Sequence, residues 1–123
     1  MKEKILFVNS CVRGDNESRT LALAKTALNR LDGDIEEIRL ADANLKPLDA
    51  AGLAKRAESA EKNDFSDPVY DCAKQFAACD TVVIAAPFWD YSFPAFLKIY
   101  IESLCVGGLT FLYGSDGVPI SYC

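Results

Sequence analysis

The chain has 123 residues, 50% of them hydrophobic and 25% charged, and its net charge is −5 because 18 acidic side chains outnumber 13 basic ones. These values are typical of one soluble domain that can bury a core of its own. Histidine is absent, which excludes Ser-His-Asp and Cys-His nucleophiles, imidazole bases and histidine-ligated metal sites. Any chemistry must therefore come from other side chains, backbone amides or a bound cofactor, and we expect no metal site.

Neither a membrane nor a nucleic acid is an expected partner. The longest apolar run, residues 82–89, is far shorter than the ~20 residues of a spanning helix. The acidic balance lacks the basic clusters that nucleic acids and anionic membranes require. The cysteines are odd in number and form no C-x-x-C pair, which indicates reduced thiols in a cytoplasmic protein; they are Cys11, Cys72, Cys79, Cys105 and Cys123.

The first forty residues are predicted to form a strand, a helix and a second strand. Residues 4–10 are an apolar run closed by polar residues, the pattern of a strand buried in a parallel sheet. Ser18 is the expected N-cap of a helix whose apolar positions recur as far as Leu31. Asp32 and Gly33 end that helix, and the half-polar segment 35–40 is predicted to be a strand near the sheet edge.

The rest of the chain continues the alternation of helices and strands. Residues 41–66 are irregular, with a short helix around 48–60. Asp67 and Pro68 open a helix whose buried face would carry Val69, Cys72, Ala73, Phe76 and Cys79. Residues 81–86 are predicted to be a buried strand, Pro94 opens a helix that reaches Leu104, and residues 110–123 suggest a hairpin.

This alternation predicts an α/β fold, with a parallel sheet covered by helices on both faces. In such sheets ligands bind at the carboxyl ends of the strands, where the strand order reverses. With strand order 2-1-3, the loops at residues 10–18 and 87–93 would be neighbours at that point.

The first loop leads to a helix N-terminus, which favours an anion such as phosphate. Ser18, Arg19 and Thr20 add two hydroxyls and a cation there. The alternative is that Ser18 only caps its helix, and Asp15 and Glu17 would repel a phosphate. A glycine-rich nucleotide fingerprint is missing, which disfavours nucleoside triphosphates and tightly bound dinucleotides.

The second loop is rich in aromatic residues: Phe88, Trp89, Tyr91 and Phe93. Exposed, they would suit stacking on a planar ring; buried, they would complete the core. Beside a phosphate-binding loop, the ligand that fits both features is flavin mononucleotide (FMN).

A small phosphatase or arsenate reductase is a competing interpretation, because Cys11 follows the first strand. Such enzymes need an arginine at the position that Glu17 occupies. An acidic residue in the loop would also raise the pKa of the thiol rather than lower it.

Several segments resemble the flavodoxin-like NAD(P)H:quinone oxidoreductases and FMN-dependent azoreductases. The similar segments are residues 5–10, 18–21, 45–49, 107–111 and, most specifically, 85–98 (AAPFWDYSFPAFLK). The resemblance implies a hydride transfer from NAD(P)H through FMN to a quinone, azo or nitro acceptor, with no catalytic side chain required. It also implies a homodimer.

The resemblance assigns the cofactor contacts by position. The phosphate and ribityl end of FMN would be held by Ser10, Asn16, Ser18 and Arg19. The isoalloxazine would be lined by Pro87, Phe88, Trp89, Asp90 and Tyr91.

Members of that family continue beyond the segment that resembles residues 110–111 with further strands and helices. We therefore expect residues 1–123 to form a single flavodoxin-like domain that is C-terminally incomplete, with the family's last strands missing. Residues 81–86 would then form an exposed hydrophobic sheet edge, unless the C-terminal hairpin or a second subunit covers it. The alternative function is a truncated, catalytically inactive flavodoxin-like binding module, and a single-electron flavodoxin is a third option.

Overall fold

The computed structural model describes residues 2–122, which divide into two compact units. The first unit contains the described residues up to Leu45 together with Cys79–Lys98, and the second contains Lys46–Ala78 and the described residues from Ile99 onward. That residues 1–123 form a single, C-terminally incomplete domain stays a prediction. Cys123 lies outside the described residues.

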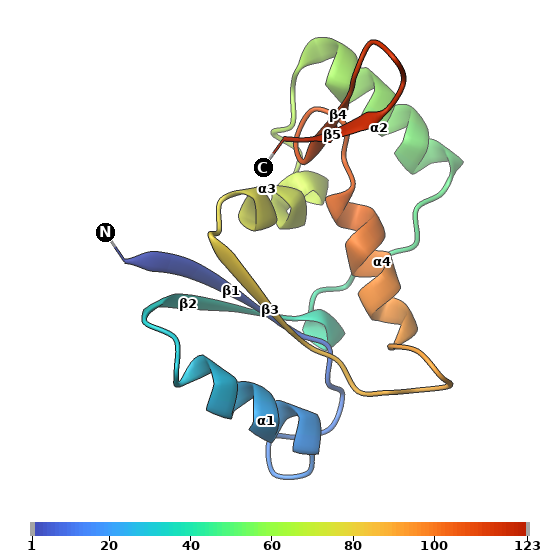
Figure 1. The fold of residues 1–123 in the computed structure, drawn as a ribbon. Helices are drawn as coiled ribbons and strands as arrows, with labels where there is room; N and C mark the ends of the chain where they lie inside the picture. The colour runs from blue at the N-terminus through green and yellow to red at the C-terminus, as the bar shows by residue number, and fades with distance from the viewer. Residues whose placement is uncertain (1, 123) are drawn as a thin grey trace. The chain divides into compact units, whose positions relative to one another are not determined.

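The first unit is built on a parallel sheet of three strands, β1 (Glu3–Asn9), β2 (Gly33–Arg39) and β3 (Thr81–Ala85). The strand order is β2-β1-β3, and Ile5 at the centre pairs with Ile35 on one side and Thr81 on the other (Figure 1). The predicted α/β class with strand order 2-1-3 is therefore confirmed.

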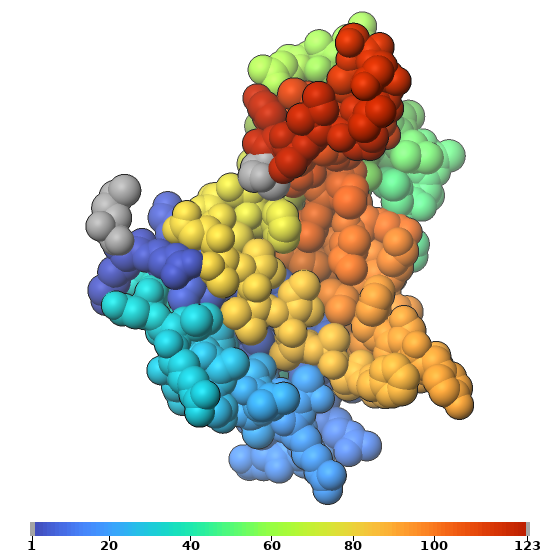
Figure 2. All heavy atoms as spheres, in the orientation of Figure 1, coloured from blue at the N-terminus to red at the C-terminus, as the bar shows by residue number. Residues whose placement is uncertain are grey.

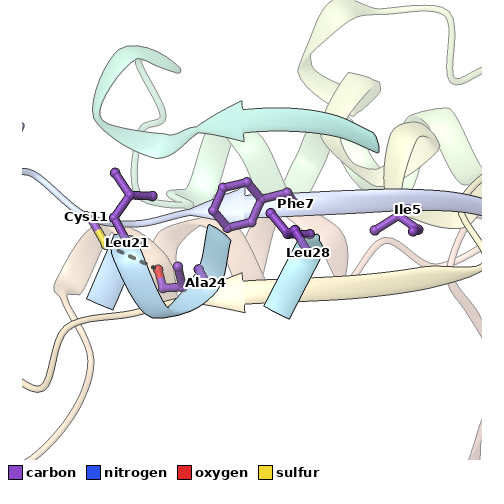
Figure 3. Close-up of a cluster of buried hydrophobic side chains, with 7 residues drawn as sticks. Ile5, Phe7, Cys11, Leu21, Ala24 and Leu28 are labelled. Atoms are coloured by element: carbon purple, nitrogen blue, oxygen red, sulfur yellow. Dashed lines mark hydrogen bonds between the residues drawn. The ribbon is translucent and has the colours of Figure 1, made fainter. Parts of the chain in front are cut away.

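β1 is the core of this unit because apolar side chains leave it in both directions. On one face Ile5 and Phe7 pack with the buried positions of helix α1 (Arg19–Leu28), which are Leu21, Ala24 and Leu28 (Figure 3). Leu6 and Val8 alternate with them and are also fully buried. Burying such a side chain stabilises the fold by ~1.5–3 kcal/mol each, so β1 holds the elements that surround it.

Two boundaries in this unit differ from the prediction, and packing explains both. Helix α1 ends at Leu28 rather than near Leu31. The Leu31 side chain is 39% exposed, so another helical turn would bury little additional apolar surface. β2 begins at Gly33, which was expected to end the helix. A Cβ at Gly33 would lie only 2.5 Å from the carbonyl oxygen of Glu3, so the close pairing of β1 and β2 requires glycine.

The two outer strands have different characters. β2 is largely exposed and half polar, as predicted for an edge strand. β3 is apolar, and Ile84 is about half exposed. Among the described strands β3 pairs with β1 alone, since the C-terminal strands β4 (Phe111–Tyr113) and β5 (Pro119–Ser121) pair with each other as the predicted hairpin.

The second unit surrounds a small cluster of Tyr70, Ala73 and Val106, with Phe65 and Leu109 packed against it. It contains helix α2 (Ala50–Lys62), capped by Asp49, and helix α3 (Asp71–Ala77). Helix α4 (Ala95–Leu104) begins in the first unit and continues into the second. One single-turn 3₁₀ helix, η1 (Leu40–Asp42), follows β2, and another, η2 (Pro68–Tyr70), precedes α3.

The helix expected from Pro68 onward is therefore divided. Asp67 does cap its start, because its carboxylate accepts the Val69 amide at 2.9 Å. The first turn is 3₁₀, however, with three residues per turn. Val69 is consequently exposed and Tyr70 takes the buried position.

α2 is the longest helix in the described part of the chain, and neither it nor any of the others there has the length and apolarity to span a bilayer.

Candidate functional site

The loop between β1 and α1 starts from a fixed point beside the end of β3. The amide and hydroxyl of Ser10 both donate to the carbonyl oxygen of Ala85, at 2.9 and 2.7 Å. The next amide, that of Cys11, donates to the Asn9 side chain at 3.0 Å. The two loops that were predicted to be neighbours therefore leave adjacent strand ends.

The same loop ends on a capped helix. The Ser18 hydroxyl accepts the Leu21 amide at 3.0 Å, and the carbonyl oxygen of Gly14 accepts the amides of Glu17 and Ser18. The Ser18 cap is thus confirmed, and its hydroxyl proton can still be donated to a ligand. The first turn of α1 presents the positive end of the helix dipole at this point, which favours an anion.

The loop after β3 folds into a tight turn. Trp89 and Ser92 exchange backbone hydrogen bonds of 2.8 Å in both directions. Between them Asp90 and Tyr91 have φ angles of 48° and 64°, as in a type I′ turn. The segment projects from the surface (Figure 2). Phe88 is 76% and Tyr91 94% exposed, and their rings pack edge to face with centroids 6.2 Å apart.

A cavity of about 610 Å³ lies between these two loops. The residues that line it include two arginines, Arg13 and Arg19, one acidic residue, Glu17, and one tryptophan. This volume is within the ~300–1,000 Å³ typical of small-molecule sites. The lining residues, all in the first unit, are Cys11, Val12, Arg13, Glu17, Ser18, Arg19, Thr20, Pro87 and Trp89.

The structure brings four of the nine predicted contact residues into this lining: Ser18, Arg19, Pro87 and Trp89. Ser10 is fully buried beneath the loop. The other four, which are Asn16, Phe88, Asp90 and Tyr91, are exposed and outside the lining. All nine roles stay predictions.

Sequence reasoning missed three lining residues. It assigned no role to Val12 or Arg13, and it considered Cys11 only as a nucleophile. The available signal was their position in the loop that follows β1. Cys11 is buried and belongs to the hydrophobic cluster under α1 (Figure 3).

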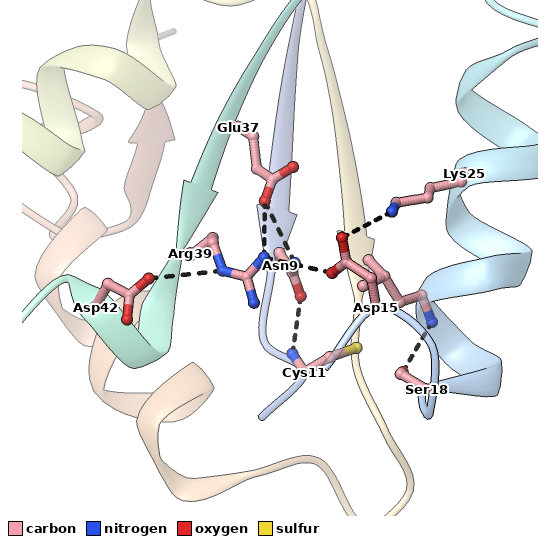
Figure 4. A network of polar contacts seen from close by, with 9 residues as sticks. Asn9, Cys11, Asp15, Ser18, Lys25, Glu37, Arg39 and Asp42 are labelled. Carbon is pink, nitrogen blue, oxygen red and sulfur yellow. Dashed lines mark hydrogen bonds and ion pairs between the residues drawn. The ribbon is translucent and has the colours of Figure 1, made fainter. Parts of the chain in front are cut away.

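Asp15, which the sequence analysis counted against an anion, has two cationic partners (Figure 4). Its carboxylate oxygens lie 3.2 Å from the ammonium of Lys25 and 3.6 Å from the guanidinium of Arg39. The hydrogen bond and charge of Lys25, and then the charge of Arg39, lower the pKa of Asp15 below its ordinary value. The negative charge in the loop is therefore compensated in place.

Relatives with curated names match most of the chain. An FMN-dependent NADH:quinone oxidoreductase of Clostridium perfringens is 32% identical over 93% of this chain and 60% of its own length. A second such protein, from Clostridium acetobutylicum, is 36% identical over 93% of this chain and 59% of its own. The chain thus spans about 60% of the length of the curated relatives it matches.

Solved structures show the same fold. An azoreductase from Bacillus anthracis str. Sterne has a TM-score of 0.73 and 25% identity, over 96% of this chain and 62% of its own. An FMN-dependent NADH-azoreductase from Bacillus anthracis str. Ames Ancestor, in complex with FMN, has a TM-score of 0.77 over 98% of this chain and 63% of its own; at 21% identity it shows the fold alone.

The model of the Flavodoxin_2 family, described as a flavodoxin-like fold, matches residues 3–122. This match covers nearly the whole chain and agrees with the β2-β1-β3 order of the sheet. The chain therefore belongs to the Flavodoxin_2 family of flavodoxin-like proteins.

Proposed function

We propose that this chain is an FMN-dependent oxidoreductase that transfers a hydride from NAD(P)H to a small quinone, azo or nitro acceptor. One observation carries the proposal: a single cavity joins an anion-favouring helix N-terminus to a loop rich in aromatic residues. The names of the relatives, FMN-dependent NADH:quinone oxidoreductase and azoreductase, support it.

The residues around the helix N-terminus fit the phosphate end of FMN. Arg13 and Arg19 offer guanidinium donors, and Ser18 and Thr20 offer hydroxyls; together they would form charge-assisted hydrogen bonds with a phosphate. Asn16 would contact the same end from the loop. The Ser10 hydroxyl already donates to Ala85, so its role would be to fix the loop.

The second loop fits the ring end. Pro87 and Trp89 already line the cavity, and Phe88, Asp90 and Tyr91 belong to the same short turn. The indole offers a flat apolar surface on which an isoalloxazine could stack. A bound FMN would supply the hydride chemistry, while these side chains would orient the ring and keep water from it.

The test is a redox assay on purified protein, with and without added FMN. We expect NADH or NADPH oxidation that depends on a small quinone such as menadione and that FMN stimulates. Protein that neither binds FMN nor oxidises NAD(P)H would contradict the proposal. FMN binding without turnover would instead support the flavodoxin-like binding module.

We further propose that the protein is a cytoplasmic homodimer. The support is the exposed aromatic pair of Phe88 and Tyr91, because exposed aromatic groups are enriched in protein interfaces. Light scattering should give the mass of a dimer, and the double variant Phe88→Ser/Tyr91→Ser should shift it towards the monomer. A monomeric wild type at micromolar concentration would contradict this proposal.

A further inference from the structure

Asp15 stands at the centre of a charge network that holds the β1–α1 loop from outside the cavity. One carboxylate oxygen contacts Lys25 on α1 at 3.2 Å, and the other contacts Arg39 at the end of β2 at 3.6 Å. Neither Lys25 nor Arg39 lines the cavity. The middle of the loop is thus tied to a helix and to a strand at the same time (Figure 4).

The network also reaches the start of the loop. Arg39 lies 3.9 Å from Glu37, whose carboxylate accepts the side-chain amide of Asn9 at 3.4 Å. Asn9 is fully buried, and its side-chain oxygen Oδ1 accepts the backbone amide of Cys11, the first lining residue. A continuous polar path therefore joins Arg39 to two separate points of the loop.

The charge balance makes Arg39 the critical member. Its guanidinium faces three carboxylates, those of Asp15, Glu37 and Asp42, at 3.6, 3.9 and 3.6 Å. Lys25 is the other cation of the group. Without Arg39, one ammonium would remain against three carboxylates beside the proposed phosphate site, and repulsion would both loosen the loop and oppose an anion.

We propose that Asp15, Lys25 and Arg39 form a positioning clamp, which holds the loop from Cys11 to Ser18 in the shape that lines the cavity and compensates the Asp15 charge for a phosphomonoester ligand. The phosphate part rests on the proposed function, whereas the loop part does not. Arg39 is in this account a positioning residue that acts through Asp15.

The first measurement needs no ligand. Hydrogen exchange of the amides of residues 12–18 should be faster in Arg39→Gln than in the wild type, and Arg39→Lys should restore protection because it keeps the charge. Lys62→Gln is the matched control, since it removes one cation from an exposed ion pair, that with Glu58 at 2.6 Å, in the second unit. Unchanged exchange in Arg39→Gln would overturn the clamp, whatever the flavin results.

The second measurement compares FMN with riboflavin, which has the same ring but no phosphate. Arg39→Gln should weaken FMN binding about 2- to 5-fold, as expected for an exposed ion-pair network, and should weaken riboflavin binding less, because riboflavin has no phosphate. High salt should remove the difference in FMN affinity between Arg39→Gln and the wild type, because ~1 M salt screens charges beyond about 3 Å. Equal losses for both flavins would overturn the phosphate part.

A double variant tests whether Arg39 acts through Asp15. In an Asp15→Asn background, Arg39→Gln should change FMN affinity less than it does in the wild type. Fully additive changes would overturn that coupling. If the wild type binds no flavin, the proposed function fails while hydrogen exchange still decides the clamp, so the two failures are distinguishable.

Discussion

Tyr91 has a φ of 64°, a left-handed conformation that bulky side chains rarely adopt. It shares the turn with Asp90, for which this conformation is less unfavourable. The tyrosine side chain is 94% exposed, so core packing does not compensate the strain. Strained backbone positions cluster at ligand-binding and active sites, and this one lies in the turn that also carries Trp89 of the cavity lining.

The strain at Tyr91 can be measured by comparing two substitutions. Both Tyr91→Gly and Tyr91→Ala remove the ring, but only alanine keeps a Cβ in the left-handed conformation. We expect Tyr91→Gly to be more stable than Tyr91→Ala by ~0.5–1 kcal/mol after the entropy of glycine in the unfolded chain is included. Chemical denaturation measures the difference in free energy of unfolding.

The same pair of substitutions at Leu23 is the control, because Leu23 is 72% exposed within helix α1. There the order should reverse, with alanine more stable by ~1 kcal/mol. If alanine is also the more stable residue at position 91, the turn is not strained.

Trp89 supplies the aromatic surface of the cavity wall. Trp89→Ala should lower FMN affinity by ~1–3 kcal/mol, the range measured for stacking of a planar heterocycle on an aromatic side chain. Fluorescence titration with FMN measures this change. Tyr122→Ala is the control, because it removes an exposed aromatic ring in the second unit, and it should leave FMN affinity unchanged. If Trp89→Ala also leaves FMN affinity unchanged, Trp89 does not stack on the flavin.

At the scale of elements, the pairing of β1 with β2 depends on Gly33. Gly33→Ala would bring a Cβ to 2.5 Å from the Glu3 carbonyl oxygen, so β2 would have to move. We expect a loss of ~1–3 kcal/mol in the free energy of unfolding. Gly14→Ala is the control, because among the described residues no heavy atom other than those of Gly14 and its chain neighbours lies within 4 Å of a Cβ there; it should be neutral or stabilising by up to ~1 kcal/mol. Equal effects at the two positions would contradict this account of the strand pairing.

The elements also show what the sequence can predict. The three parallel strands follow from local patterns, because each is a short apolar or half-polar run closed by polar residues or proline. Gly33 could not be placed correctly, since a glycine that ends a helix and a glycine that lets two strands approach look the same in sequence. The 3₁₀ turn at Pro68–Tyr70 was missed because tertiary packing buries Tyr70 in place of Val69.

The site was predictable to a similar degree. Ser18, Arg19 and Trp89 lie in or beside loops that the sheet topology brings together, so the pattern of strands indicated them, whereas the role of Pro87 was assigned by the resemblance alone. The contact between Asp15 and Arg39 was not predictable, because it joins a loop to a strand end 24 positions away, as the two residue numbers show. Because this contact could not be foreseen, Asp15 was expected to repel an anion.

At the scale of the whole molecule, stability should depend on pH at both extremes. Ion pairs and hydrogen bonds lower the pKa values of Asp15, Glu58, Asp64 and Asp67 below 3.8 or 4.5. The stability that these four carboxylates contribute is therefore present above their ordinary pKa values. It is lost as the pH falls through their lower pKa values in the folded protein. Paired Lys55 and Lys62 have pKa values raised above 10.5, and burial raises the pKa of Cys72 above 9.0.

For the groups whose pKa is raised, the dependence of stability on pH has the opposite direction. Their contribution to stability is present at lower pH and is lost as the pH rises through the pKa in the folded protein. We expect a plateau of stability between ~pH 5 and pH 9 with a decline on either side. The carboxylates and lysines are exposed, so ~1 M salt should flatten the acid decline. Thermal unfolding from about pH 2 to pH 12 at two salt concentrations measures the acid decline, the alkaline decline and the effect of salt, and a maximum near pH 4 would contradict the assignment.

We propose that the cavity between the β1–α1 and β3–α4 loops binds FMN through its phosphate and its ring. Titration of the purified protein with FMN and with riboflavin, followed by flavin fluorescence, tests it most directly. We expect saturable binding of one FMN per chain, weaker binding of riboflavin, and a loss of this preference in Arg19→Gln. Absence of saturable FMN binding, or equal affinity for the two flavins, would contradict it.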